Sequence, residues 1–167
     1  MHYFYGTAAA PFTRAHEAIV RSILEKDETN RVYVAVTDHG YKEVSLPWVL
    51  RAKTAEVNLE DCIEAGRVLL LKQDERTYAF LSKLHDWMDV IVVGEDEWLS
   101  LQAGEWHYSD ELLSSWQWKV FPRRDGVSSS EVRKLLASGA SYEQVKHLIT
   151  EKTWDVLQPS LHLLQHK

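Results

Sequence analysis

Short apolar runs that suit buried strands recur along the chain, and segments with helical spacing separate them. The runs from Arg31 to Thr37 and from Val90 to Val93 are rich in β-branched residues, which is typical of strands covered on both faces of a sheet. Shorter runs from Tyr3 to Tyr5, Val68 to Leu71 and Trp118 to Phe121 have the same character. This alternation predicts an α/β fold with a doubly wound parallel sheet.

Helices are expected between these strands, and two more are expected to close the chain. The expected helices cover residues 14–26, 48–57, 77–87, 128–137 and 142–157. The 167 residues contain no repeat or flexible linker, so one domain spanning residues 1–167 is predicted. Ligands of doubly wound sheets bind beyond the carboxyl ends of the strands, so the loops there are expected to hold the site.

Composition narrows the classes of function. No apolar run reaches the ~18 residues that a membrane span needs. A net charge of −6, from 19 Lys and Arg against 25 Asp and Glu, argues against a nucleic-acid binder and leaves small molecules as the expected partners. Cys62 is the single cysteine and the N-terminus lacks a secretory pattern, so a reducing, cytoplasmic location is expected.

The loop after the first expected strand is one candidate site. Gly6 and Thr7 follow the strand, while Thr13 and His16 stand three residues apart at the start of the next helix. A helix N-terminus attracts anions, so a hydroxyl and an imidazole on its first turn would suit a phosphate. The alternative is structural, with Thr13 as the N-cap and His16 as a partly exposed helix residue.

A second candidate site lies before the helix expected at residues 128–137. Ser128 and Glu131 alone would make a capping box. The further hydroxyls of Ser129 and Ser130 and the guanidinium of Arg133 instead suggest groups that converge on phosphate oxygens.

These two segments together resemble the signatures of the nucleotidylyltransferase superfamily, whose fold is Rossmann-like. The first reads G6-T7-A8-A9-A10-P11-F12-T13-R14-A15-H16, and the second reads G126-V127-S128-S129-S130-E131-V132-R133. The first segment departs from the superfamily signature in three ways. Alanines replace a Phe-Asp pair, one extra residue lies between Thr7 and Pro11, and Ala15 replaces a Gly.

The middle of the chain resembles one branch of that superfamily, the nicotinate and nicotinamide mononucleotide adenylyltransferases. V93-G94-E95-D96 with Trp106 ten residues later is similar to a stretch in which the Asp lies by the ATP ribose and the Trp stacks on the pyridine ring. Lys42, in H39-G40-Y41-K42, resembles a lysine placed against phosphates, and R76-T77-Y78 resembles a step that shapes the pyridine pocket. The alternatives are an N-cap for Asp96, a core role for Trp106 and a solvated surface for Lys42.

The resemblance implies adenylyl transfer from ATP to nicotinamide or nicotinate mononucleotide, giving the dinucleotide and pyrophosphate. It implies that Thr13 and His16 bind oxygens near the breaking bond. The triphosphate would be held by Lys42, Arg133 and the serines, with Mg²⁺ carried in by ATP. Gly6, Thr7 and Trp106 would hold the pyridine nucleotide, with Gly94 and Asp96 beside the nucleotide.

Several alternatives stay open on the sequence. The chain could be a pantetheine-phosphate adenylyltransferase, a cytidylyltransferase, or a catalytically weakened nucleotide sensor of the same fold. The choice between amide and acid mononucleotide and the oligomeric state, a homo-oligomer included, are also open.

Overall fold

The predicted strands form one five-stranded parallel sheet. The computed structural model describes residues 1–38, 46–84, 87–122 and 129–165. The strand order is β3-β2-β1-β4-β5, and every neighbouring pair is parallel. The strands are β1 (His2–Thr7), β2 (Arg31–Thr37), β3 (Val68–Gln73), β4 (Val90–Gly94) and β5 (Gln117–Phe121). The α/β doubly wound class predicted from the sequence is confirmed.

The order of the strands reverses between β1 and β4. The chain winds outward from β1 through β2 to β3 and then returns to β4 on the other side of β1. Tyr3 of β1 is paired with Val32 of β2 on one side and with Val90 of β4 on the other. The carboxyl ends of β1 and β4 therefore form the switch point at which such sheets bind ligands.

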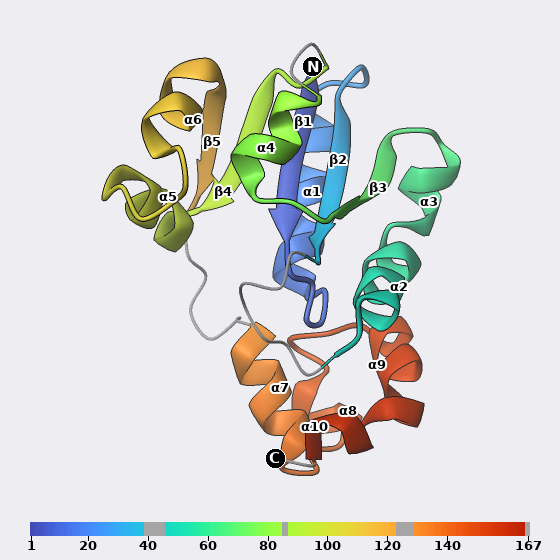
Figure 1. Ribbon diagram of the computed structural model, residues 1–167. Helices are drawn as coiled ribbons and strands as arrows, with labels where there is room; N and C mark the ends of the chain where they lie inside the picture. Colours follow the sequence, from blue (N-terminus) through green and yellow to red (C-terminus); the bar gives the residue numbers. More distant parts are fainter. Residues whose placement is uncertain (39–45, 85–86, 123–128, 166–167) are drawn as a thin grey trace.

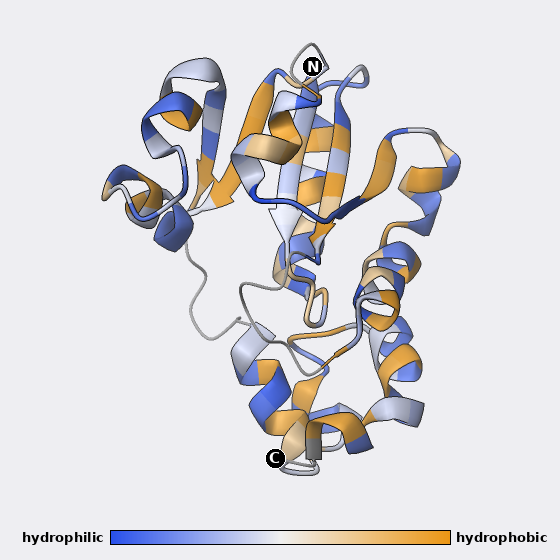
Figure 2. Cartoon of the chain, viewed as in Figure 1, coloured by the Kyte–Doolittle hydropathy of each residue, from blue (hydrophilic) through white to orange (hydrophobic). Residues whose placement is uncertain are grey.

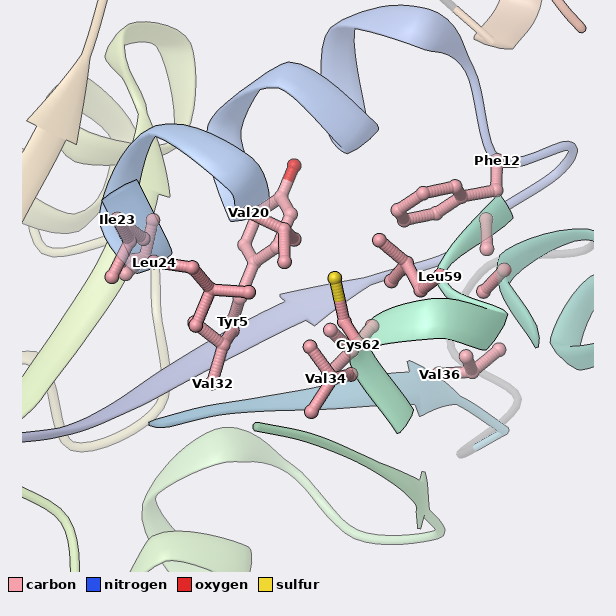
Figure 3. Close-up of a cluster of buried hydrophobic side chains, with 14 residues drawn as sticks. Tyr5, Phe12, Val20, Ile23, Leu24, Val32, Val34, Val36, Leu59 and Cys62 are labelled. Carbon is pink, nitrogen blue, oxygen red and sulfur yellow. The ribbon is translucent and has the colours of Figure 1, made fainter. Parts of the chain in front are cut away.

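One face of the sheet packs on α1 (Arg14–Lys26), α2 (Trp48–Asn58) and α3 (Glu60–Glu64). In Figure 3 the side chains of this first cluster meet between α1 and the strands. Fully burying a Val, Leu, Ile or Phe side chain stabilises the folded state by about 1.5–3 kcal/mol. The labelled members are Tyr5, Phe12, Val20, Ile23, Leu24, Val32, Val34, Val36, Leu59 and Cys62.

The opposite face is covered by α4 (Thr77–Ser82), α5 (Glu95–Gln102) and α6 (Ser109–Ser115). Phe4 and Ile91 of the sheet pack there on Leu81, Leu101 and Leu112, one from each helix. Figure 1 shows α4 in front of the sheet and α1 behind it. In Figure 2 the hydrophobic colour is strong in β4 and in parts of β2 and β3, whereas β1 is mostly pale.

The helices at the end of the chain make a third cluster beyond the carboxyl ends of the strands (Figure 1). They are α7 (Ser129–Ala137), α8 (Tyr142–Val145), α9 (Glu151–Leu157), the 3₁₀ turn η1 (Gln158–Ser160) and α10 (His162–Gln165). Leu46 packs into this cluster, and Asn58 Nδ2 of α2 donates to Thr153 Oγ1 of α9 at 2.6 Å. These contacts fix the terminal helices against α2.

The prediction of one helix over residues 142–157 is wrong. Leu148 and Ile149 are buried between α8 and α9, and the side chain of Thr150 caps the start of α9. The carbonyl of Leu148 accepts from the N–H of Arg14 at 2.9 Å instead of from a helical neighbour. The sequence did not show this break, because the buried positions on both sides of it keep helical spacing. These are Val145, Leu148, Ile149, Thr153 and Leu157.

Two further differences concern short helices. The helix expected over residues 77–87 ends at Ser82, and Lys83 and Leu84 lie in a turn. Two short helices, α3 and α6, were not predicted, and α5 was expected only as a helix after Gly94 without bounds. Each of the three buries a single residue of its own, namely Cys62, Leu101 or Leu112. One buried residue gives no periodic signal to read. Within the described parts of the chain, no helix is long and apolar enough to cross a membrane.

We predict that Ile149→Ala lowers the free energy of unfolding by about 2–5 kcal/mol, because it leaves a cavity in the third cluster. Ile149 is 0% exposed, whereas Leu99 on α5 is 58% exposed. The control Leu99→Ala should change stability by about 0.5 kcal/mol or less. Chemical denaturation of both variants measures the difference, and equal small losses would contradict the burial of the segment between α8 and α9.

Candidate active site

Two adjoining cavities open at the carboxyl ends of the strands. The larger, of about 780 Å³, is lined by the ends of β1, β2, β3 and β4 and by the start of α2. The smaller, of about 290 Å³, lies beside α1 and the end of β5. Asp96 and Glu97 of α5 line both cavities, so the two adjoin at the switch point.

Four of the predicted residues line the larger cavity: Gly6, Thr7, Asp96 and Trp106. Trp106 lies between α5 and α6, half-buried against the second core cluster, so one part of it packs and another part faces the cavity. The N-cap of α5 is Gly94, and Asp96 stands in the first turn. The alternative that Asp96 caps this helix is therefore wrong.

The smaller cavity holds His16 and Gly94, with Asp96 at the junction. The His16 ring packs 5.1 Å from the ring of Phe12 and 6.3 Å from that of Tyr5. Tyr5 is buried beneath it, and burial together with the nearby Glu97 raises the pKa of the Tyr5 phenol. The Tyr5 phenol is consequently uncharged at neutral pH.

His16 and Thr13 form a capping box at the start of α1. The Thr13 N–H donates to His16 Nδ1 at 2.9 Å, and the His16 N–H donates to Thr13 Oγ1 at 3.4 Å. Burial lowers the pKa of His16 to about 4, so the imidazole is neutral near pH 7. Because Nδ1 is an acceptor here, this hydrogen-bond assignment places the single ring proton on Nε2.

The structural interpretation of Thr13 is confirmed. Thr13 is the N-cap, it is 2% exposed, and its polar groups bond to His16. It is not among the described residues that line either cavity. Thr13 thus orients the imidazole, and the phosphate contact that the resemblance implies for it stays a prediction.

Two alanines of the first signature are tightly packed. Ala9 and Ala10 are 1% and 0% exposed, and Ala9 has a φ of 48°, a left-handed conformation that side chains rarely adopt. Larger side chains would have no room there. Ala15 lines the smaller cavity beside His16.

The start of α7 docks on this loop. Ser129 Oγ donates to the carbonyl of Pro11 at 2.9 Å, and Arg133 donates to the carbonyl of Ala10 at 2.7 Å. Arg133 also donates to Ser130 Oγ at 3.2 Å, and burial lowers the pKa of its guanidinium. The second signature is therefore brought against the first, although its residues are not among those described as lining either cavity.

Two predicted residues, Lys42 and Ser128, lie outside the described residues. In the ranges that the structure does describe, no group of three or more His, Cys, Asp and Glu side chains is arranged to hold a metal ion.

Arg51 is a site residue that sequence reasoning missed. It is 3% exposed, lines the larger cavity, and donates to the carbonyls of Ala8 at 2.8 Å, Thr37 at 2.7 Å and Leu46 at 2.9 Å. Asp38 lies 3.7 Å from its guanidinium. Burial lowers the pKa of Arg51 and Asp38 opposes that shift.

A signal for Arg51 was present in the sequence. The buried face of α2 consists of Arg51, Thr54, Ala55 and Asn58, which recur at helical spacing but are mostly polar. A search for apolar periodicity passes over such a face. Gln73, at the end of β3, and Trp48, at the start of α2, also line the larger cavity and were not singled out.

The sequence matches no protein-family model and no curated protein. Solved structures do match over nearly the whole chain. A Vibrio parahaemolyticus protein provisionally named nicotinate-nucleotide adenylyltransferase is 17% identical, with a TM-score of 0.77 over 99% of this chain and 96% of that one.

Two structures of Plasmodium falciparum nicotinic acid mononucleotide adenylyltransferase are also similar. The one complexed with NaAD is 17% identical, with a TM-score of 0.75 over 95% of this chain and 94% of that one. The one complexed with APC is 16% identical, with a TM-score of 0.74 over 97% of each chain. The chain therefore has the Rossmann-like fold of the nicotinate-nucleotide adenylyltransferases, as its sequence resemblance implied.

Proposed function

We propose that this protein transfers the adenylyl group of ATP to a pyridine mononucleotide, forming a dinucleotide and pyrophosphate. The observation that carries the proposal is the pair of adjoining cavities at the switch point, one with the His16 imidazole and the other with Trp106. The fold is that of enzymes named for nicotinate-nucleotide adenylyl transfer, and two of the similar structures contain NaAD or APC.

In the proposed reaction a phosphate oxygen of the mononucleotide attacks the α-phosphorus of ATP. The bond from that phosphorus to the bridging oxygen breaks, and pyrophosphate leaves with the electron pair. The reaction needs positioning and stabilisation of charge on the oxygens more than it needs covalent help from the protein.

His16 would supply a donor for those oxygens. Its Nδ1 is held by the Thr13 N–H at 2.9 Å, so a neutral ring presents Nε2–H. The first N–H groups of α1 add a partial positive charge at the same place. Thr13 acts as a positioning residue in this scheme.

The cations and hydroxyls of the second signature would hold the triphosphate. Arg133 is fixed beside the first signature through its bond to Ala10. We assign Lys42 and Ser128, Ser129 and Ser130 to the same task, as the resemblance implied. Mg²⁺ would enter with the phosphates of ATP and offset their charge.

We predict that His16→Gln lowers the turnover number roughly 10²-fold or more, the scale for loss of one donor to the transition state. Glutamine at this position can still complete the capping box, so the free energy of unfolding should stay within about 1 kcal/mol of the parent. The exposed His147 gives the control, since His147→Gln should leave turnover unchanged. Unchanged turnover in a folded His16→Gln protein would remove His16 from the mechanism.

The His16 ring should titrate near pH 4 by NMR, because burial disfavours its charged form. An unfolded chain binds this proton at about pH 6.5. As the pH falls the unfolded state is therefore protonated first, and the contribution to stability that is present above about pH 6.5 is lost towards pH 4. His16→Gln should remove this component from the dependence of unfolding free energy on pH. His16 is half-buried, as the structural alternative expected, and a ring pKa near 6.5 would contradict the desolvation of this ring.

If Trp106 stacks on the pyridine ring, Trp106→Ala should weaken mononucleotide binding by about 1–2 kcal/mol, whereas Trp106→Phe keeps a ring face and most of the affinity. Isothermal titration measures both, with ATP affinity expected to stay constant. Trp87, 61% exposed, provides the control Trp87→Ala, which should bind normally. Normal binding by Trp106→Ala, or equal binding of phosphopantetheine by the parent protein, would favour a different nucleotidyl acceptor.

A further inference from the structure

Gln73 is a buried amide in the larger cavity that the proposed mechanism does not use. It ends β3, is 1% exposed and lines the same cavity as Trp106. Its Nε2 donates to the carbonyl of Glu75 at 3.0 Å and to Thr77 Oγ1 at 3.4 Å. A carbonyl oxygen only accepts hydrogen bonds, so the Glu75 contact fixes which end of the amide carries the NH₂ group.

The oxygen end of this amide lies next to Gly6, which also lines the cavity. A Cβ atom at Gly6 would lie 3.3 Å from Gln73 Oε1, closer than most real contacts, so glycine leaves the oxygen accessible. Among the residues that the structure describes, no hydrogen bond reaches Oε1, and Oε1 is not one of their fully buried unpaired atoms, so it is open to the cavity. An acceptor that is open to the cavity can receive a hydrogen bond from a ligand N–H.

The two pyridine mononucleotides differ in the group that could meet this oxygen. A carboxamide carries N–H donors, whereas a carboxylate carries only acceptors and a negative charge. We propose, resting on the adenylyl transfer proposed above, that Gln73 Oε1 accepts a hydrogen bond from the substrate carboxamide and makes nicotinamide mononucleotide the preferred acceptor. A substrate carboxylate at this position would be repelled, because its oxygens and Gln73 Oε1 are all acceptors and no hydrogen bond can form.

Both signs of charge line the cavity. Asp38 lies 3.7 Å from the buried guanidinium of Arg51, and Glu105 accepts a 2.6 Å bond from Ser100 Oγ. The proposed preference therefore depends on the hydrogen bond to Gln73 Oε1 and not on the charge of the cavity.

Arg76 is a second cation that lines the cavity and could favour an acid substrate. Its side chain is exposed, at the N-cap of α4, where water weakens its attraction for an anion. The experiment therefore includes Arg76→Gln.

The test compares kcat/KM for nicotinamide and nicotinate mononucleotide at saturating ATP. The parent protein should prefer the amide at least about tenfold, the scale for one hydrogen bond together with the avoided repulsion. Gln73→Met removes the acceptor at similar size and should reduce the preference to within about threefold, through a loss with the amide. Gln117, exposed on β5, gives the matched control Gln117→Met, which should keep the parent preference.

Gln73→Glu is a second variant. It loses the Nε2–H donated to the Glu75 carbonyl but retains an acceptor, so when folded it should keep or strengthen the amide preference. ATP titration and thermal unfolding show whether each variant is folded. A parent protein that prefers the acid would overturn this inference and leave adenylyl transfer standing. So would a preference that moves with Arg76→Gln but not with Gln73→Met. Transfer to neither mononucleotide would overturn the proposed function and this inference with it.

Discussion

The main chain from Ala8 to Pro11 is held by side chains of other elements, and the site depends on these bonds. Arg51 of α2 bonds to the carbonyl of Ala8, while Arg133 and Ser129 of α7 bond to those of Ala10 and Pro11, all at 2.7–2.9 Å. Buried peptide groups must be paired, and alanine side chains cannot pair them. Two cationic side chains and a hydroxyl therefore replace the partners that this segment cannot provide for itself.

The terminal helices consequently support the loop beside the site, even though their hydrophobic cluster is separate from the cores of the sheet. They reach the start of α1 through α7 and through the carbonyls of Lys146 and Leu148, which accept from Arg14 at 2.8 Å and 2.9 Å. The capping box that follows orients His16 as a neutral donor. A donor that is already oriented costs little reorganisation when charge develops on a phosphate, which is the kind of help that phosphoryl transfer requires.

The sheet could be predicted because its strands are continuous β-branched runs, such as residues 31–37, whose burial on both faces leaves few alternatives. The break at residues 146–150 could not, because it depends on a contact with Arg14 that is distant in sequence. In the site, His16 and Trp106 were found because motif spacing and an aromatic marked them. Gln73 was not found, because only the folded structure shows that its Oε1 lies beside Gly6 in the cavity.

The central claim is that ATP and a pyridine mononucleotide react directly in the cavities at the switch point. The most direct measurement incubates the full chain with ATP labelled at the α-phosphate and separates the products after a single turnover. The account predicts label in a pyridine dinucleotide, unlabelled pyrophosphate in equal amount, and no label on the protein. Binding of ATP with no transfer, or transfer of the label to phosphopantetheine in preference to either pyridine mononucleotide, would contradict it.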